Sequence, residues 1–89
     1  MGVAHKSLRV LELIEQLIRQ GNASALSDAA TGAALAVSSI LGAEYNVRIN
    51  TKGLPTAKAT SILNEFVTLK KHAAEIEARI HTALHERGL

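Results

Sequence analysis

The sequence predicts an all-α fold, a three-helix antiparallel up-down bundle segment that is completed by oligomerisation. Apolar residues recur every three or four positions along most of the chain, which is the period of a helix. Residues that end helices divide the chain near residues 21–26 and 53–55. The 89 residues are expected to form one helical domain, residues 1–89, and a core of this size needs a partner for strong stability.

The first helix is predicted over residues 4–20. Gly21 supplies its stop signal, because glycine tolerates the left-handed geometry that often follows a helix. Arg19 lies in the last turn, where a positive charge is favoured. One apolar stripe is expected to face the core, formed by Val10, Leu11, Ile14, Leu17 and Ile18.

The second helix is predicted over residues 27–52, from Ser27 as its N-cap to the stop signals Gly53 and Pro55. Asp28 falls in the first turn, where free amides favour a carboxylate. The helix is apolar on two adjacent faces, so it is expected to be central. The first face contains Ala29, Ala33, Ala36, Ile40, Ala43 and Val47, and the second contains Ala30, Ala34, Val37 and Leu41. Small residues at helical spacing predict close approach of neighbouring backbones: Gly32, Ala36, Ser39 and Ala43.

The third helix is predicted to begin with Pro55 in its first turn. Its apolar positions alternate in spacings of three and four, as in a coiled-coil strand. At 1.5 Å per residue it would span ~45 to 50 Å, against ~35 Å for the second helix, so its end is expected to overhang a monomer. Self-association through the second and third helices follows. The seam consists of Ala59, Ile62, Phe66, Leu69, Ala73, Ile76, Ile80 and Ala83.

Composition argues against several classes of partner. Ten Lys or Arg stand against eight Asp or Glu, and Tyr45 and Phe66 are the only aromatic residues, so nucleic-acid binding has no support. The uncharged run over residues 29–43 falls short of the ~20 apolar residues that cross a bilayer, so no membrane span is expected. There is no cysteine and no recognisable targeting signal, so a cytoplasmic location is expected.

One stretch of the sequence carries a family resemblance. Residues 21–50, GNASALSDAATGAALAVSSILGAEYNVRIN, place Gly-Asn, Ser-Asp, Gly-Ala and Asn-Val-Arg-Ile-Asn in a characteristic order and spacing. The stretch resembles the carboxy-terminal half of the formiminotetrahydrofolate cyclodeaminase and methenyltetrahydrofolate cyclohydrolase family. The helices before and after it are also similar to those of the family, so the resemblance covers nearly the whole chain.

The resemblance implies an all-helical, dimer-forming domain that acts on tetrahydrofolate one-carbon derivatives. It would form 5,10-methenyltetrahydrofolate with release of ammonia, or hydrolyse it to the 10-formyl compound. Asp28 is the expected catalytic carboxylate, and the expected substrate-binding residues are Ser27, Asn46, Arg48 and Asn50. Neither a metal nor a cofactor is required, because a carboxylate and amides can move the proton and stabilise the cation.

Each of these residues also has an ordinary structural interpretation. Asp28 suits the start of a helix, Arg48 lies one turn after Glu44 and can pair with it, and Asn46 and Asn50 can bond the backbone. His81 and His85 follow Glu77 at spacings of one turn, which a metal could use, but a solvated helix flank explains them more readily.

The chain is about half the length of the family's members and lacks their first half. It is therefore a fragment, one subunit of a split enzyme whose other half domain is a separate chain, or a shortened relative that self-associates. The alternative function is a non-catalytic helical assembly module. Asp28 and Arg48 lie ~30 Å apart along one helix, so a shared site would require the second helices of two chains to lie antiparallel.

Overall fold

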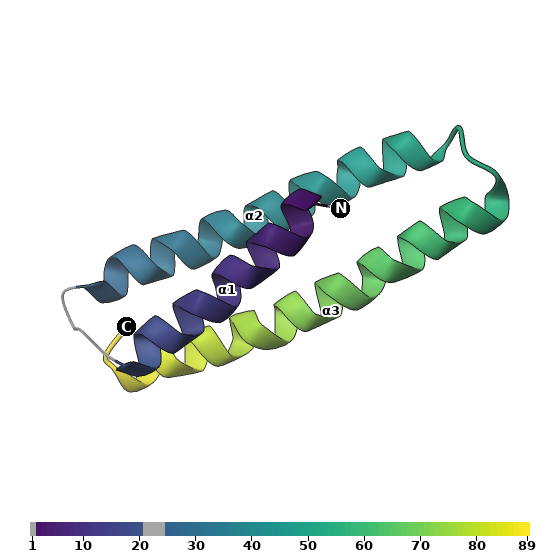
Figure 1. Cartoon of the computed structure of the whole chain (residues 1–89). Helices are drawn as coiled ribbons and strands as arrows, with labels where there is room; N and C mark the ends of the chain where they lie inside the picture. Colours follow the sequence, from purple (N-terminus) through teal and green to yellow (C-terminus); the bar gives the residue numbers. More distant parts are fainter. Residues whose placement is uncertain (1, 21–24) are drawn as a thin grey trace.

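The computed structural model describes residues 2–20 and 25–89, and these form three helices without any strand in this part of the chain. The helices are α1 (Gly2–Gln20), α2 (Leu26–Thr51) and α3 (Thr56–Glu86). They run up, down and up beside one another (Figure 1). The predicted all-α, three-helix architecture is confirmed. The predicted Gly-Asn turn at residues 21 and 22 lies outside the described residues.

The molecule is long and narrow, with extents of 49 × 17 × 15 Å. Helix α1 packs against both α2 and α3 and covers only one part of their length, so the α2–α3 connection projects beyond it as a two-helix hairpin (Figure 1). The overhang predicted for the end of α3 lies instead at this hairpin. The end of α3 is held by α1, because Arg87 donates a 3.0 Å hydrogen bond to the carbonyl oxygen of Ile18.

The core is a set of apolar side chains drawn from all three helices. The seam predicted for α3 is confirmed: Phe66, Leu69, Ala73, Ile76 and Ile80 are buried, and Ala59, Ile62 and Ala83 are half-buried. The α1 and α2 members of the core are Ala4, Leu11, Ile14, Ile18, Leu26, Ala33, Ala36 and Ile40.

The stripe predicted for α1 is wrong at two positions. Val10 and Leu17 are 43% and 62% exposed, whereas Leu11, Ile14 and Ile18 are buried. The two residues lie on the flank of α1 that points away from the shared core, because only α2 and α3 contact this helix in the described chain.

The start of α2 also differs from the prediction. Ala25 occupies the N-cap position without a side-chain capping bond, and the helix begins at Leu26, one residue before Ser27. Leu26 is buried at 7% exposure, and its packing into the core favours the earlier start. Ser27 therefore lies inside the first turn together with Asp28, and its carbonyl accepts a 3.0 Å hydrogen bond from the Thr31 hydroxyl.

The start of α3 differs by a smaller step. Pro55 stands at the N-cap position, immediately before the first residue of the helix. Its carbonyl oxygen accepts a 3.0 Å hydrogen bond from the amide of Ala59. Pro55 therefore takes part in the first turn of α3, where its lack of a backbone N–H costs no hydrogen bond.

Close approach to α2 is confirmed at Gly32. A Cβ atom added there would lie 3.1 Å from Cδ1 of Ile14, so the missing side chain lets α1 approach. Gly42, about three turns further along, has nothing within 4 Å of such an atom. Helix α2 is therefore packed on one side and open on another.

By length and composition alone, α2 would also qualify as a membrane-crossing helix, the one such helix among the described residues. A core helix of a soluble protein meets the same criteria when it is mostly buried, whereas 22% of the apolar window of α2 is buried. Here one face of α2 packs against α1 and α3, and Glu44 near its end contacts Lys70 of α3 at 3.0 Å.

Replacing Ile76 with alanine tests the described core. Ile76 has no exposed surface, and truncating such a side chain typically costs about 2–5 kcal/mol. We expect Ile76→Ala to lower the free energy of unfolding by this amount in urea titrations followed by circular dichroism. The matched control is Val67→Ala on the same helix, which is 64% exposed and should change stability by less than about 0.5 kcal/mol. Equal effects of the two changes would contradict this packing.

Candidate functional site

The catalytic candidate, Asp28, lies at an apolar hollow between α1 and α2. The hollow has a volume of about 290 Å³. Among the described residues that line it, Asp28 is the one with a charged side chain, and it is exposed. The first-turn amides and the positive end of the α2 dipole favour a negative charge at this position. The other lining residues are Ile14, Leu17, Ile18, Ala25, Leu26, Ala29 and Gly32.

Ser27 does not share this hollow. It lines a second one, of about 570 Å³, between α2 and the end of α3. Consecutive residues on a helix point about 100° apart, so Ser27 and Asp28 face different neighbours. Glu77, His81 and His85 line the hollow with Ser27. Within the described ranges, no three side chains of the metal-binding types come close enough to hold an ion.

The other predicted binding residues lie at the far end of α2. Arg48 donates to Glu44 at 3.2 Å, which is the one-turn contact expected from the sequence. Glu44 also accepts from Lys70 of α3 at 3.0 Å. Asn46 and Asn50 are exposed, and they lie on roughly the opposite side of α2 from Arg48.

One copy of the chain does not bring these groups together. Asp28 and Asn46 are about five helical turns apart, or ~27 Å along the axis. Because five turns return to the same direction, the two side chains nevertheless lie on one side of α2. A ligand that contacts both at one reacting centre would require a second chain.

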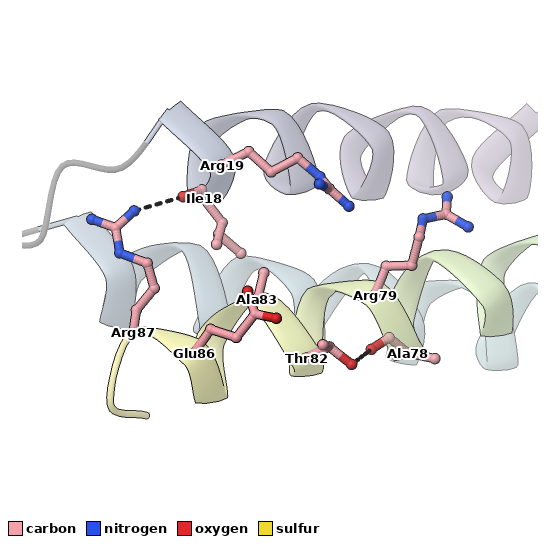
Figure 2. A pocket seen from close by; sticks show the side chains of 8 residues that line it. All are labelled: Ile18, Arg19, Ala78, Arg79, Thr82, Ala83, Glu86 and Arg87. Atoms are coloured by element: carbon pink, nitrogen blue, oxygen red, sulfur yellow. Dashed lines mark hydrogen bonds between the residues drawn. The ribbon is translucent and has the colours of Figure 1, made fainter.

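Sequence reasoning missed an ionic cluster that fastens α1 to α3. Glu15 accepts from Arg79 at 2.7 Å and from Arg19 at 3.1 Å. An open hollow of about 490 Å³ lies beside this cluster. Figure 2 shows Arg19 on its α1 side, Arg79 rising from α3 toward α1, and Arg87 at its end. Glu15 and Arg79 are far apart in the chain, so no local spacing predicts their contact. The one signal in the sequence is that each residue stands next to a buried position, Ile14 on α1 and Ile80 on α3.

These contacts alter the ionisation of two glutamates. The hydrogen bond from Arg79 lowers the pKa of Glu15 below its ordinary value, although partial desolvation opposes the change. The ammonium of Lys70 lowers the pKa of Glu44 in the same way. Both carboxylates therefore stay ionised in mild acid, and each fastens α3 to another helix.

Comparison with known proteins identifies a family for this chain. The family model described as formiminotransferase-cyclodeaminase matches residues 1–68. This range includes α1, α2 and the first part of α3, while residues 69–89 lie beyond it. No curated protein and no solved structure matches the chain.

The pH dependence of stability tests the contacts that Glu15 and Glu44 make with α3. Because the pKa of each carboxyl is lower in the folded chain, the unfolded chain binds more protons in acid. The stabilisation from these contacts is therefore present above the ordinary glutamate pKa of about 4.3, and it is lost as the pH falls through the lowered pKa values. We expect Glu15→Gln to lower the Tm at pH 7 by roughly 2 to 6 °C and to flatten its decrease below pH 4.

The matched control for this experiment is Glu12→Gln on the same helix. Glu12 pairs with Arg9 of its own helix at 3.1 Å and fastens no other element. Thermal melts at several pH values should leave this variant close to the unchanged chain. A pH profile that Glu15→Gln leaves unaltered would contradict the assigned contact.

Proposed function

Because the chain belongs to the formiminotransferase-cyclodeaminase family, we propose that it acts on a folate-bound one-carbon unit, forming or hydrolysing 5,10-methenyltetrahydrofolate. The observation that supports this most directly is the position of Asp28, a carboxylate at the edge of an apolar hollow. The proposed setting is the cytoplasm.

In this proposal Asp28 supplies the charge and the proton acceptor. The methenyl bridge is a cation, and an ionised carboxylate beside it lowers the energy of positive charge. Water adds to the bridging carbon and Asp28 accepts a proton from it. Asp28 then returns this proton to folate N5 as the carbon–N5 bond breaks, and the hydroxyl of the tetrahedral carbon loses its proton to solvent to leave the 10-formyl compound. In the cyclodeaminase direction, N10 attacks the carbon of the protonated formimino group, Asp28 passes the N10 proton to the amino group of the tetrahedral carbon, and the carbon–nitrogen bond breaks to release ammonia. Both routes pass through a tetrahedral carbon.

The hollow is too small for a whole folate. Sites for small molecules usually measure ~300 to 1,000 Å³, so about 290 Å³ accommodates a ring but not the attached tail. In the proposal, Asn46 and Asn50 of a second chain hydrogen-bond the polar edge of the ligand, because within one chain Asn46 lies ~27 Å from Asp28. Arg48 with Lys70 leaves a net positive charge around Glu44, which suits the carboxylates of a glutamate tail. Ser27 stays a weaker candidate, because it lines the other hollow.

A second candidate function is a helical assembly module without chemistry. It is favoured by the large exposed apolar side chains on α2. Under this proposal the chain serves to join copies of itself or to complete a separate chain that carries the other half domain. Folate would then have no effect on the purified protein.

Titration with 5,10-methenyltetrahydrofolate separates the two functions. We expect the chain to raise the rate of loss of methenyl absorbance above the rate in buffer, and Asp28→Asn to lower this catalysed rate by about 100-fold or more. The matched control is Glu65→Gln, which also neutralises an exposed carboxylate but lies on α3 near His5. It should keep the original rate.

The same protein samples provide a binding measurement. Folate binding should raise the Tm of the unchanged chain and of the control variant. If the chain neither accelerates the reaction nor gains thermal stability with saturating ligand, the assembly function is favoured and the catalytic proposal fails for this chain alone.

A further inference from the structure

The hollow between α1 and α2 combines an apolar lining with a single carboxylate. Apart from Asp28, none of the described residues that line it has a polar side chain: Ile14, Leu17, Ile18, Ala25, Leu26, Ala29 and Gly32. Polar parts of a ligand that are buried against such a lining lose their hydrogen bonds to water. The hollow therefore favours a ligand with an apolar body and one charged edge.

We propose that this hollow binds a single benzene ring that carries a nitrogen cation on its edge, with the ring against the apolar lining and the cation against Asp28. In the reaction proposed above, this ring is the aminobenzoyl ring of the folate, whose nitrogen N10 carries the one-carbon unit. This identification rests on the proposed function. The preference for an aromatic cation does not.

The volume of the hollow fits one ring. An apolar cavity of about 150 Å³ is sufficient for benzene. A hollow of about 290 Å³ therefore holds a benzene ring together with the first atoms of its substituents. The pterin of a folate has two fused rings with several donors and acceptors, so it is larger and would lose its hydrogen bonds in this lining. The pterin therefore lies outside the hollow.

The contact between α1 and α2 gives the hollow a close-packed wall. A Cβ atom added at Gly32 would lie 3.1 Å from Cδ1 of Ile14, so the two helices meet closely here. Ile14 and Leu26 are both buried, whereas Leu17 is 62% exposed. Leu17 thus forms the outer edge of the hollow, where its side chain lies against the outer face of a bound ring.

Charge selects a cation for the edge of the ring. None of the ion pairs within residues 2–20 and 25–89 involves Asp28. The positive end of the α2 dipole favours the ionised form of this carboxylate. A cationic amidinium group attracts the carboxylate and donates hydrogen bonds to its two oxygens, as a guanidinium does. A neutral ring gains the apolar contacts alone, and an anionic ring is repelled.

The proposed orientation also brings the reacting carbon to the carboxylate. N10 is bonded directly to the aminobenzoyl ring, and the one-carbon unit is bonded to N10. A ring in the hollow therefore holds this carbon two bonds from its edge, on the side of Asp28. The glutamate tail leaves from the opposite edge of the same ring.

Benzamidine tests the site, because it contains the ring and the cation without the rest of a folate. In NMR titrations we expect it to shift the methyl signals of Ile14, Leu17 and Leu26, since an aromatic ring shifts the protons above its face. Benzamide has the same shape without the charge, and it should bind about 3-fold more weakly. Benzoate should bind more weakly than benzamide. Asp28→Asn should remove the difference between benzamidine and benzamide.

The place of the ring is tested by Leu17→Ala. This change should weaken the binding of benzamidine and of benzamide alike, by about 3-fold or more, because it removes apolar contact area from both. The matched control is Leu35→Ala on α2, which is 64% exposed and does not line the hollow. It should leave both affinities unchanged. Both positions are exposed, and circular dichroism checks that each variant stays folded.

The outcomes separate this inference from the proposed function. Binding of benzamidine in the hollow without conversion of 5,10-methenyltetrahydrofolate would support the site and remove the proposed function. Conversion that Leu17→Ala leaves unchanged in KM, with no methyl shifts from benzamidine, would overturn the site and keep the function. The site is also overturned if benzoate binds as tightly as benzamidine, or if pterin-6-carboxylate shifts these methyl signals in place of benzamidine.

Discussion

Helix α2 is apolar around most of its circumference, and the two helices beside it cover only one side. This imbalance is the constraint on which the rest of the structure depends. The covered side accepts α1 at Gly32, where the absence of a side chain lets Ile14 approach. The uncovered side presents Leu35, Tyr45 and Ile49 to water, at a cost in free energy that a second helix would remove. The interior of the bundle is thus well packed, but large apolar side chains on one side of α2 stay exposed.

The charged residues of α2 stand only near its two ends. Its uncharged middle is bounded by Asp28 on one side and by Glu44, Arg48 and Lys52 on the other. Glu44 accepts from Arg48 of the same helix and from Lys70 of α3, and the Lys70 contact fastens the hairpin. Asp28 has no such role and lies beside an apolar hollow instead. The family match is to formiminotransferase-cyclodeaminase, and one copy holds Asp28 ~27 Å along α2 from Asn46.

Sequence reasoning was reliable where the pattern was local. The α3 seam and the pair of Glu44 with Arg48 follow from intervals of three and four residues, and both are present. It was unreliable where neighbours decide the outcome. Val10 and Leu17 are as apolar as Leu11 and Ile18, and only the direction from which α2 and α3 approach α1 separates exposed from buried. The Glu15–Arg79 contact joins distant segments, so no local pattern contains it. Ser27 had the chemistry of a cap, but burial of Leu26 moved the start of the helix.

The way α1 is held has a consequence for how the protein is made. Its last turns are fastened by Arg79 and Arg87, close to the end of the chain. During synthesis the amino-terminal helix therefore leaves the ribosome long before the segment that anchors it. At ~5 to 20 residues per second the wait lasts several seconds. Through that interval Leu11, Ile14 and Ile18 have only α2 to pack against, so we expect the core to close after the segment with Arg79 and Arg87 has been made.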